Sequence, residues 1–328
     1  MTAIGPRNPK QEAQERLPPG FEAYVLEPSP PAVDDGEYKA DDPATPSGPD
    51  PSITRVTSTT AGDVTWDDMS ARLPHLRDFA SEHWLGAWPR LGELPGGYTA
   101  TVNSLGQVAF FVLAPARYGQ QGKVGLRYTF RGLGTPFFGR DRQVRVEEEY
   151  LVVQDGDAAR GDAVTTLSEA ARLVGIEFRQ TWGPSWRDPP AEADPQRPLT
   201  IDPEAVLACS DILGFGFSIL EQVRIEARSK EQASRVQLWP EHFDAAVEIG
   251  DEKEGRRAAF GVSPGYAAHA EPFVYVSPWS KDGLDDPYWN ADFFGGSILE
   301  YSDLLTVKDQ RETALGFLRR GLEMLRAR

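Results

Sequence analysis

The chain has 328 residues, of which 40% are hydrophobic, 10% aromatic and 26% charged. This composition is typical of a globular protein with a hydrophobic core, and it excludes the collagen-like, fully disordered and disulfide-rich classes. Fifty acidic against 34 basic residues give a formal net charge of −16, which argues against nucleic acid and anionic membrane surfaces as partners. A single cysteine, Cys209, excludes an internal disulfide, and the first residues lack a signal-peptide pattern, so we expect a cytoplasmic protein.

The first 60 residues differ in composition from the rest of the chain. They contain eleven prolines, ten acidic and five basic residues, and few apolar residues. Such a segment buries too little surface to offset the entropy of ordering, so 1–60 is predicted to be a disordered acidic tail. A single domain is expected over 61–328, with two similar strand-then-helix halves, about 61–200 and 201–328, as a further possibility. It should begin with a helix near Thr65.

The first half shows the alternating pattern of strands. We expect a hairpin of Tyr98–Val102 and Val108–Leu113, followed by a strand over 124–130 that pairs with 144–152. Each of the later two strands has one apolar and one charged face. The charged faces are interpreted as solvated, with exposed ion pairs; their residues are Lys123, Arg127, Thr129, Arg131, Arg145, Glu147 and Glu149.

Helices are predicted at three further places. A short one spans Thr166–Val174, and a second begins at Asp202 with a capping residue, a first-turn proline and an acidic first turn. Because the second is apolar nearly all round from Val206 to Leu220, it is interpreted as a buried central helix; the competing transmembrane interpretation is weakened by Asp211, glycines and serines. An amphipathic terminal helix starts near Val307. Between them we expect strands over 235–249, 256–262 and 273–277.

The predicted fold class is therefore α+β, with antiparallel sheet or sheets, a buried central helix and a packed terminal helix. One catalytic motif can be set aside at this stage. Gly261–Gly265 matches the G-x-S-x-G pattern of serine hydrolases, but Pro264 follows the serine and has no N–H to donate to an oxyanion. This segment is interpreted as a turn.

His242 and Asp244 are the candidate catalytic residues. On a continuous strand they would share one face, while Trp239 and Phe243 would point into the core. Such a pair can relay a proton or supply two metal ligands, and a third ligand could come from His269, Glu248 or Asp292. The competing interpretation is a histidine that is hydrogen-bonded to its neighbour on a sheet surface.

A second candidate site is the aromatic loop of residues 277–296. It contains several large rings outside any periodic pattern, which suits the wall of an apolar pocket and also suits a loop anchored to its own core. The candidate ligand-binding residues are Trp279, Tyr288, Trp289 and Asn290.

Several short motifs resemble those of an uncharacterised bacterial family of unknown function. They are TFRGLGTPFFG around Arg131, the Trp-x-x-His-Phe-Asp stretch at Trp239–Asp244, Glu271–Phe273, and LEYSDLL followed by ALGFL near the end. The resemblance spans about residues 98–325 and implies no activity, but it draws attention to His242, Phe243 and Asp244. A lysine-containing early helix and a Ser-His-Glu stretch of that family have no equivalent here.

The sequence favours a cytoplasmic binding or interaction protein that holds a small apolar molecule or a partner segment against the aromatic loop. The alternative is a metal-assisted or general-base hydrolase that uses His242 and Asp244. Whether the protein is an enzyme stays open, with the balance toward a non-enzymatic role. No cofactor and no resident metal is predicted.

Overall fold

A computed structural model describes residues 88–328, apart from 130, 137, 140–141, 156–157, 184–189 and 267, together with the backbone of two earlier strands. These strands, β1 (Arg55–Thr59) and β2 (Gly62–Thr65), pair antiparallel. Thr65 therefore ends a strand and does not begin the predicted helix; β-branched residues around it favour the extended chain. The rest of the predicted tail and of the early helices lies outside the described residues.

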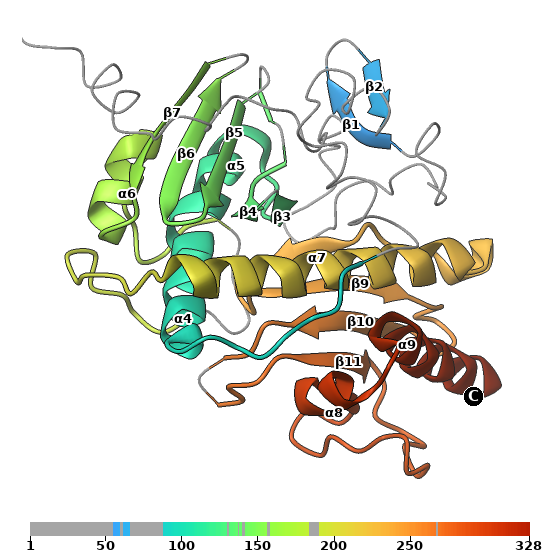
Figure 1. The fold of residues 1–328 in the computed structure, drawn as a ribbon. Helices are drawn as coiled ribbons and strands as arrows, with labels where there is room; N and C mark the ends of the chain where they lie inside the picture. Colours follow the sequence, from blue (N-terminus) through green and yellow to red (C-terminus); the bar gives the residue numbers. More distant parts are fainter. Residues whose placement is uncertain are drawn as a thin grey trace, which may run out of the picture.

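The described residues from 88 onward contain two antiparallel sheets of five strands each (Figure 1). The first sheet has the order β3-β4-β5-β6-β7 and the second has the order β8-β9-β10-β11-β12, so each is a meander of consecutive strands. The strands of the first sheet are β3 (Arg127–Thr129), β4 (Gly132–Gly134), β5 (Arg142–Glu147), β6 (Tyr150–Asp155) and β7 (Ala158–Ala163). Those of the second are β8 (Gln237–Trp239), β9 (Asp244–Ile249), β10 (Ala258–Ser263), β11 (Phe273–Pro278) and β12 (Ser297–Glu300). This architecture confirms the α+β fold class.

The order of elements repeats along the chain. A helical segment precedes the first sheet, formed by α4 (Tyr98–Val108), the π-helical turn η1 (Ala109–Leu113) and α5 (Ala114–Gln121), and α6 (Leu167–Val174) follows it. The second sheet is preceded by α7 (Pro203–Glu226) and the short η2 (Ser229–Glu231), and is followed by α8 (Tyr301–Thr306) and α9 (Gln310–Ala327). Leu126 and Leu238 exchange backbone hydrogen bonds of 2.8 and 2.7 Å, which connect the two sheets.

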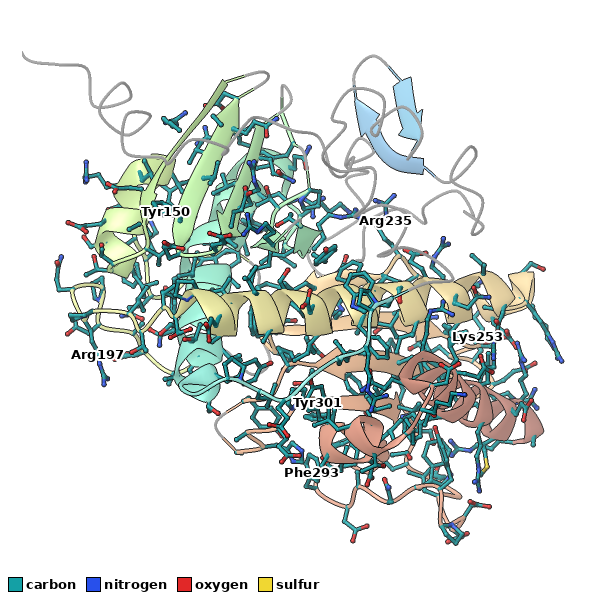
Figure 2. The ribbon with its side chains drawn as sticks, viewed as in Figure 1. Tyr150, Arg197, Arg235, Lys253, Phe293 and Tyr301 are labelled. Atoms are coloured by element: carbon teal, nitrogen blue, oxygen red, sulfur yellow. The ribbon has the colours of Figure 1, made fainter. Side chains whose placement is uncertain are left out.

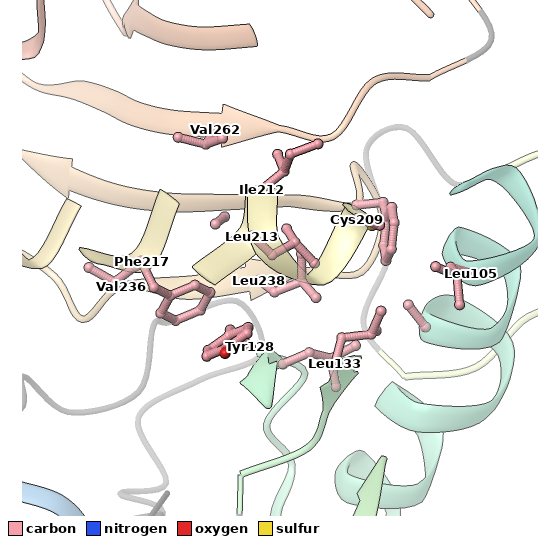
Figure 3. Packing of buried hydrophobic residues seen from close by; sticks show 14 of the residues in the cluster. Leu105, Tyr128, Leu133, Cys209, Ile212, Leu213, Phe217, Val236, Leu238 and Val262 are labelled. Carbon is pink, nitrogen blue, oxygen red and sulfur yellow. The ribbon is translucent and has the colours of Figure 1, made fainter. Parts of the chain in front are cut away.

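The central helix is α7, and the prediction of its start and burial is confirmed. The Asp202 carboxylate accepts a hydrogen bond from the backbone N–H of Ala205 at 3.1 Å, and Pro203 occupies the first turn. In Figure 3, side chains of α7 such as Leu213 lie between Val262 of the second sheet and Tyr128 and Leu133 of the first. The helix therefore holds both sheets to one core.

Two helices are long and apolar enough to cross a membrane by length and composition, Tyr98–Gln121 and Pro203–Glu226. Most residues of both apolar windows are buried inside the protein, 67% and 72% respectively. The same test is passed by core helices, so burial against the sheets accounts for their apolar character.

The predicted hairpin at Tyr98–Leu113 is wrong, because this segment is helical. Apolar residues at positions 98, 102, 105 and 108 follow helical spacing and are buried. Asn103 and Gly106 indicated a turn, but burial of the helix on several sides overrides their preference.

The strand predicted over 144–152 and its pairing with 124–130 are also wrong in detail. The segment turns at Glu148, which has a φ of 52°, and so divides into β5 and β6, while β4 lies between β3 and β5. The charged face is not solvated around Arg145, whereas Arg131 is exposed and forms an ion pair with Glu148. Arg145 is fully buried and donates to Glu147 at 2.9 Å and to Gln154 at 3.0 Å.

The C-terminal helix α9 confirms the amphipathic pattern of the sequence. Its apolar positions are buried against the second sheet, and Asp309 caps it by accepting from the N–H of Glu312 at 2.9 Å. A glycine at position 321 allows close approach, because a Cβ there would lie 2.9 Å from the side chain of Val276. α7 and α9 thus cover the same face of the second sheet (Figure 1).

Candidate functional site

The face of the second sheet opposite α7 and α9, here called the far face, carries the polar residues of interest. Val262 and Val276 face the helices, so their strand neighbours Gly261 and Tyr275 face the other way. The same alternation places Ala245 and Val247 in the core and Asp244 on the far face. Alternation along β9 therefore assigns Asp244 to the face opposite Val247, as predicted, but Trp239 pairs with Asp244 and so lies on the far face and not in the core.

Tyr275 reaches across the sheet to Asp244. Gly261 on β10 is paired with Tyr275 of β11 on one side and with Ala246 of β9 on the other. A Cβ at Gly261 would lie only 2.3 Å from Cζ of the tyrosine ring, so glycine is what allows the ring to lie over β10. The phenol hydroxyl donates a hydrogen bond to Oδ2 of Asp244. The glycine of the G-x-S-x-G pattern thus serves packing on the far face.

His242 does not share a strand with Asp244, which corrects the sequence prediction. Residues 240–243 form the turn between β8 and β9, and Trp239 and Asp244 are the last paired residues before it. Pro240 cannot donate to a ladder, and Phe243 adopts a left-handed φ of 52° with its ring buried. The His242 side chain is exposed in this turn.

Glu241, on the same turn as His242, is the acid that interacts electrostatically with Asp244. Burial raises the pKa of Glu241 to about 7; the negative charge of Asp244 adds to the shift, and His242 opposes it. Burial also raises the pKa of Asp244, against the opposing effects of His242 and of the Tyr275 hydrogen bond. Burial and the Asp244 carboxylate raise the pKa of Tyr275, which holds this phenol in its neutral, donating form. We call Glu241 and Asp244 the carboxyl pair.

The possible third ligands lie in other environments. His269 Nε2 is 2.9 Å from Glu300 Oε2, Glu248 forms a 2.9 Å ion pair with Arg257, and Asp292 is exposed. Over the residues that the structure describes, no three histidine, cysteine or carboxylate side chains come together in a way that could hold a metal ion. The structure thus brings Asp244 together with Glu241 and Tyr275.

The aromatic loop is anchored to the protein by three of its four predicted binding residues. Tyr288 and Trp289 are buried, and the Tyr288 hydroxyl donates to the carbonyl of Phe317 at 2.9 Å. The Asn290 amide donates to the carbonyl of Ile298 at 3.0 Å and accepts from its N–H at 2.8 Å. Trp279 is 48% exposed, with the guanidinium of Arg257 5.3 Å from its ring centre.

A group of rings that the sequence did not predict as a group lies beside the carboxyl pair, and it includes Phe293 and Phe294 of the aromatic loop. The ring of His269 lies 4.7 Å from that of Phe273 and stacks at 6.0 Å on Phe293. Phe293 is 59% exposed and Tyr266 is 38% exposed, and Figure 2 shows Phe293 below α7, on the side away from β5–β7. We call the following residues the aromatic patch: Tyr266, His269, Phe273, Phe293 and Phe294.

Tyr275 joins the aromatic patch to the carboxyl pair. Its ring centre lies 6.0 Å from that of Phe273 and 6.2 Å from that of Phe294, while its hydroxyl bonds to Asp244. The far face therefore presents exposed rings at one end and buried carboxylates at the other. A hollow of about 160 Å³ between β7 and α6 lies in the other half and includes none of these residues.

The chain was compared with models of known protein families, with curated proteins and with solved structures, and none of them matches. The resemblance to a bacterial family of unknown function therefore stays a prediction, and the function has to be inferred from the far face itself.

Proposed function

We propose that this protein is a cytoplasmic binding protein that holds a basic segment of a partner protein on the aromatic patch. The observation that carries this proposal is the exposure of Phe293 on a continuous group of rings. Isolated exposed apolar residues are common, but grouped ones mark interaction sites, and aromatic residues dominate the energy of such sites. The proposal keeps the binding role favoured by the sequence and moves the contact surface from Tyr288 and Trp289 to Phe293.

Charge supports a basic partner. The protein carries a net charge of −16, and exposed acids adjoin the patch in the chain, Glu271 beside Phe273 and Asp292 beside Phe293. Lysine and arginine side chains can place their stems on aromatic rings and their charges near carboxylates. Long-range attraction would also raise the rate of encounter with a basic partner.

The geometry gives less support to a hydrolase that uses His242 and Asp244. His242 is exposed in the turn, and one oxygen of Asp244 accepts from Tyr275. A general base has to reach both its orienting group and the reacting proton. We therefore prefer the binding role.

The test compares exposed rings inside and outside the patch. Tagged wild type, Tyr266→Ser/Phe293→Ser and the control Trp279→Ser would be used to capture partners from the native cell extract, and the captured protein would then be purified for direct titration. We expect the double variant to bind at least about tenfold more weakly, the range for interface anchors, while Trp279→Ser binds like wild type. Equal binding by all three proteins, with folding confirmed by circular dichroism, would contradict the proposal.

A further inference from the structure

Several carboxylates elsewhere in the described chain are paired with arginine. Each of these ion pairs has an N–O distance of 2.6 to 2.9 Å. They are Glu147 with Arg145, Glu221 with Arg224, Glu226 with Arg319, Glu231 with Arg326, and Glu248 with Arg257. Arginine is therefore a recurring partner of partly buried carboxylates in this protein, while Asp202 and Asp251 accept hydrogen bonds from backbone N–H groups instead.

The carboxyl pair departs from this pattern. Two buried carboxylate oxygens in the described part of the chain lack any hydrogen-bond partner, Oε2 of Glu241 and Oδ1 of Asp244, and both belong to the β8–β9 turn. Asp244 is only 7% exposed, and no lysine or arginine among the described residues forms an ion pair with either acid. Unpaired buried carboxylate oxygens are costly, so their occurrence side by side calls for an explanation.

We propose that Glu241 and Asp244 together bind one lysine ammonium group, supplied by the basic partner segment whose docking on the aromatic patch is the proposed function. Each acid offers one free oxygen, and the two oxygens belong to different carboxylates. An ammonium has three donors that can point to separate acceptors, whereas a guanidinium fork is shaped for the two oxygens of a single carboxylate. Lysine therefore fits this arrangement better than arginine.

Tyr275 connects this site to the patch. Its hydroxyl occupies Oδ2 of Asp244 and leaves Oδ1 free, while its ring lies beside Phe273 and Phe294. A lysine stem can therefore lie along aromatic rings while its ammonium reaches the carboxylates. Glu241 is half-buried and His242 exposed, so the site lies near the molecular surface.

Binding should depend on pH, because the ammonium requires ionised carboxylates. The groups that face the pair are His242 on the same turn and Tyr275 on β11, with Glu248 of β9 acting on Tyr275 and paired to Arg257. The pKa of Glu241 is about 7 in the free protein. Affinity for lysine should therefore fall as the pH drops below about 7, and bound lysine should lower this pKa.

The test uses the full chain and three small probes: N-acetyl-lysine N-methylamide, its norleucine analogue, which lacks the ammonium, and its arginine analogue. Carboxyl ¹³C resonances of Glu241 and Asp244 would be followed in pH titrations with and without each probe. We expect the lysine probe alone to lower the pKa of Glu241. Glu241→Gln and Asp244→Asn should weaken lysine binding about tenfold or more, whereas Glu252→Gln, an exposed acid in another turn, should leave it unchanged.

Each outcome decides between specific alternatives. An unchanged Glu241 titration in the presence of the lysine probe would overturn the ammonium site and indicate that the pair holds a shared proton instead. An equal effect of the arginine analogue would overturn the preference for lysine. The Glu241 titration is measured on the wild-type protein, so it tests the ammonium site even if Asp244→Asn fails to fold. If the lysine probe has no effect but capture of the partner still depends on Phe293, the ammonium site is wrong and the proposed function stands. The two proposals can therefore fail separately.

Discussion

The Arg145 network of the first sheet and the carboxyl pair at the edge of the second deal with buried charge in opposite ways. In the first sheet Arg145 is fully buried, yet its guanidinium bonds to Glu147 and Gln154 from the same sheet. In the second sheet Glu241 and Asp244 also lose water, but each keeps a buried oxygen without a partner. A polar network that is complete within the chain contributes to the fold. An incomplete polar network leaves a charge that a bound ligand can balance. For this reason we place the binding site at the second sheet.

The largest effect is expected where both sheets share a core. Leu213 of α7 has no exposed surface, so Leu213→Asp would place a carboxylate among apolar side chains and should cost more than about 4 kcal/mol, near the top of the range for single substitutions. Leu213→Ala should cost about 2–5 kcal/mol through the cavity alone. Urea unfolding followed by fluorescence and by circular dichroism would measure both. A stable Leu213→Asp protein would refute the placement of α7.

Breaking the complete network should be almost as costly. Arg145→Met leaves Glu147 buried without its cation, and we expect a loss of about 3–5 kcal/mol in the free energy of unfolding. Arg145→Met/Glu147→Gln should recover part of this loss, because it removes the uncompensated charge. Denaturant titration of the two variants gives the comparison. If both lose the same stability, the ion pair is not what Arg145 contributes.

The contact that organises the far face should have a moderate effect. Gly261→Ala adds a Cβ that would lie 2.3 Å from the Tyr275 ring, which forces the ring off β10 and removes its hydrogen bond to Asp244. We expect a loss of about 1–3 kcal/mol. Tyr275→Phe should lower the free energy of unfolding by about 1–2 kcal/mol, because the hydrogen bond to Asp244 is lost. Gly261→Ala should be equally costly in the Tyr275→Phe background, because the ring remains. A neutral Gly261→Ala would mean that Tyr275 does not cross the sheet there.

The carboxyl pair should also be visible in the pH dependence of stability. The folded pKa of Glu241, about 7, lies above its ordinary value of 4.5, so the folded state binds an additional proton between these values. Its contribution is fully present below about pH 4.5 and is lost as the pH rises through about 7. In Glu241→Gln, the free energy of unfolding should therefore fall less steeply between about pH 4.5 and 7 than in the wild type, as urea unfolding at a series of pH values would measure. Asp211, whose pKa is raised to about 6, also titrates in this pH range. Because Asp211 is present in both the wild type and Glu241→Gln, the difference between the two proteins reports on Glu241.

Local signals in the sequence predicted the helices whose ends are set by their own residues. Asp202 caps α7 through a hydrogen bond three residues away, and Thr166 caps α6 in the same manner. The helix at Tyr98–Gln121 was missed because it contains turn-forming residues. Burial of the helix stabilises it in spite of them, and local propensity carries no information on burial. The strand through His242 was wrong because alternation assumes an uninterrupted ladder, and Pro240 begins a turn.

The candidate site was predicted only in part for a related reason. Asp244 could be found because it follows a histidine and borders an apolar strand. Its partners Tyr275 and Gly261 come from other strands, and only the register of the sheet brings them together. The aromatic patch likewise joins Tyr266 to Phe293, which are far apart in the chain. The pair of adjacent phenylalanines among glycines at 293–296 was the one local sign of that surface.

The smallest effect on stability is expected at His242, and it separates the roles of the turn residues. The side chain is exposed, so His242→Ala should change the free energy of unfolding by no more than about 0.5 kcal/mol. Its electrostatic interaction nevertheless lowers the pKa of both Glu241 and Asp244, so its removal should move the titration of Glu241 above its wild-type midpoint. ¹³C titration of the carboxyl groups would detect this shift, with His269→Ala as a control because His269 is engaged by Glu300.

A titration of Glu241 that does not respond to His242→Ala would show that the histidine does not act on Glu241. An upward shift without loss of stability would mean that His242 tunes a site whose binding groups are the two carboxylates.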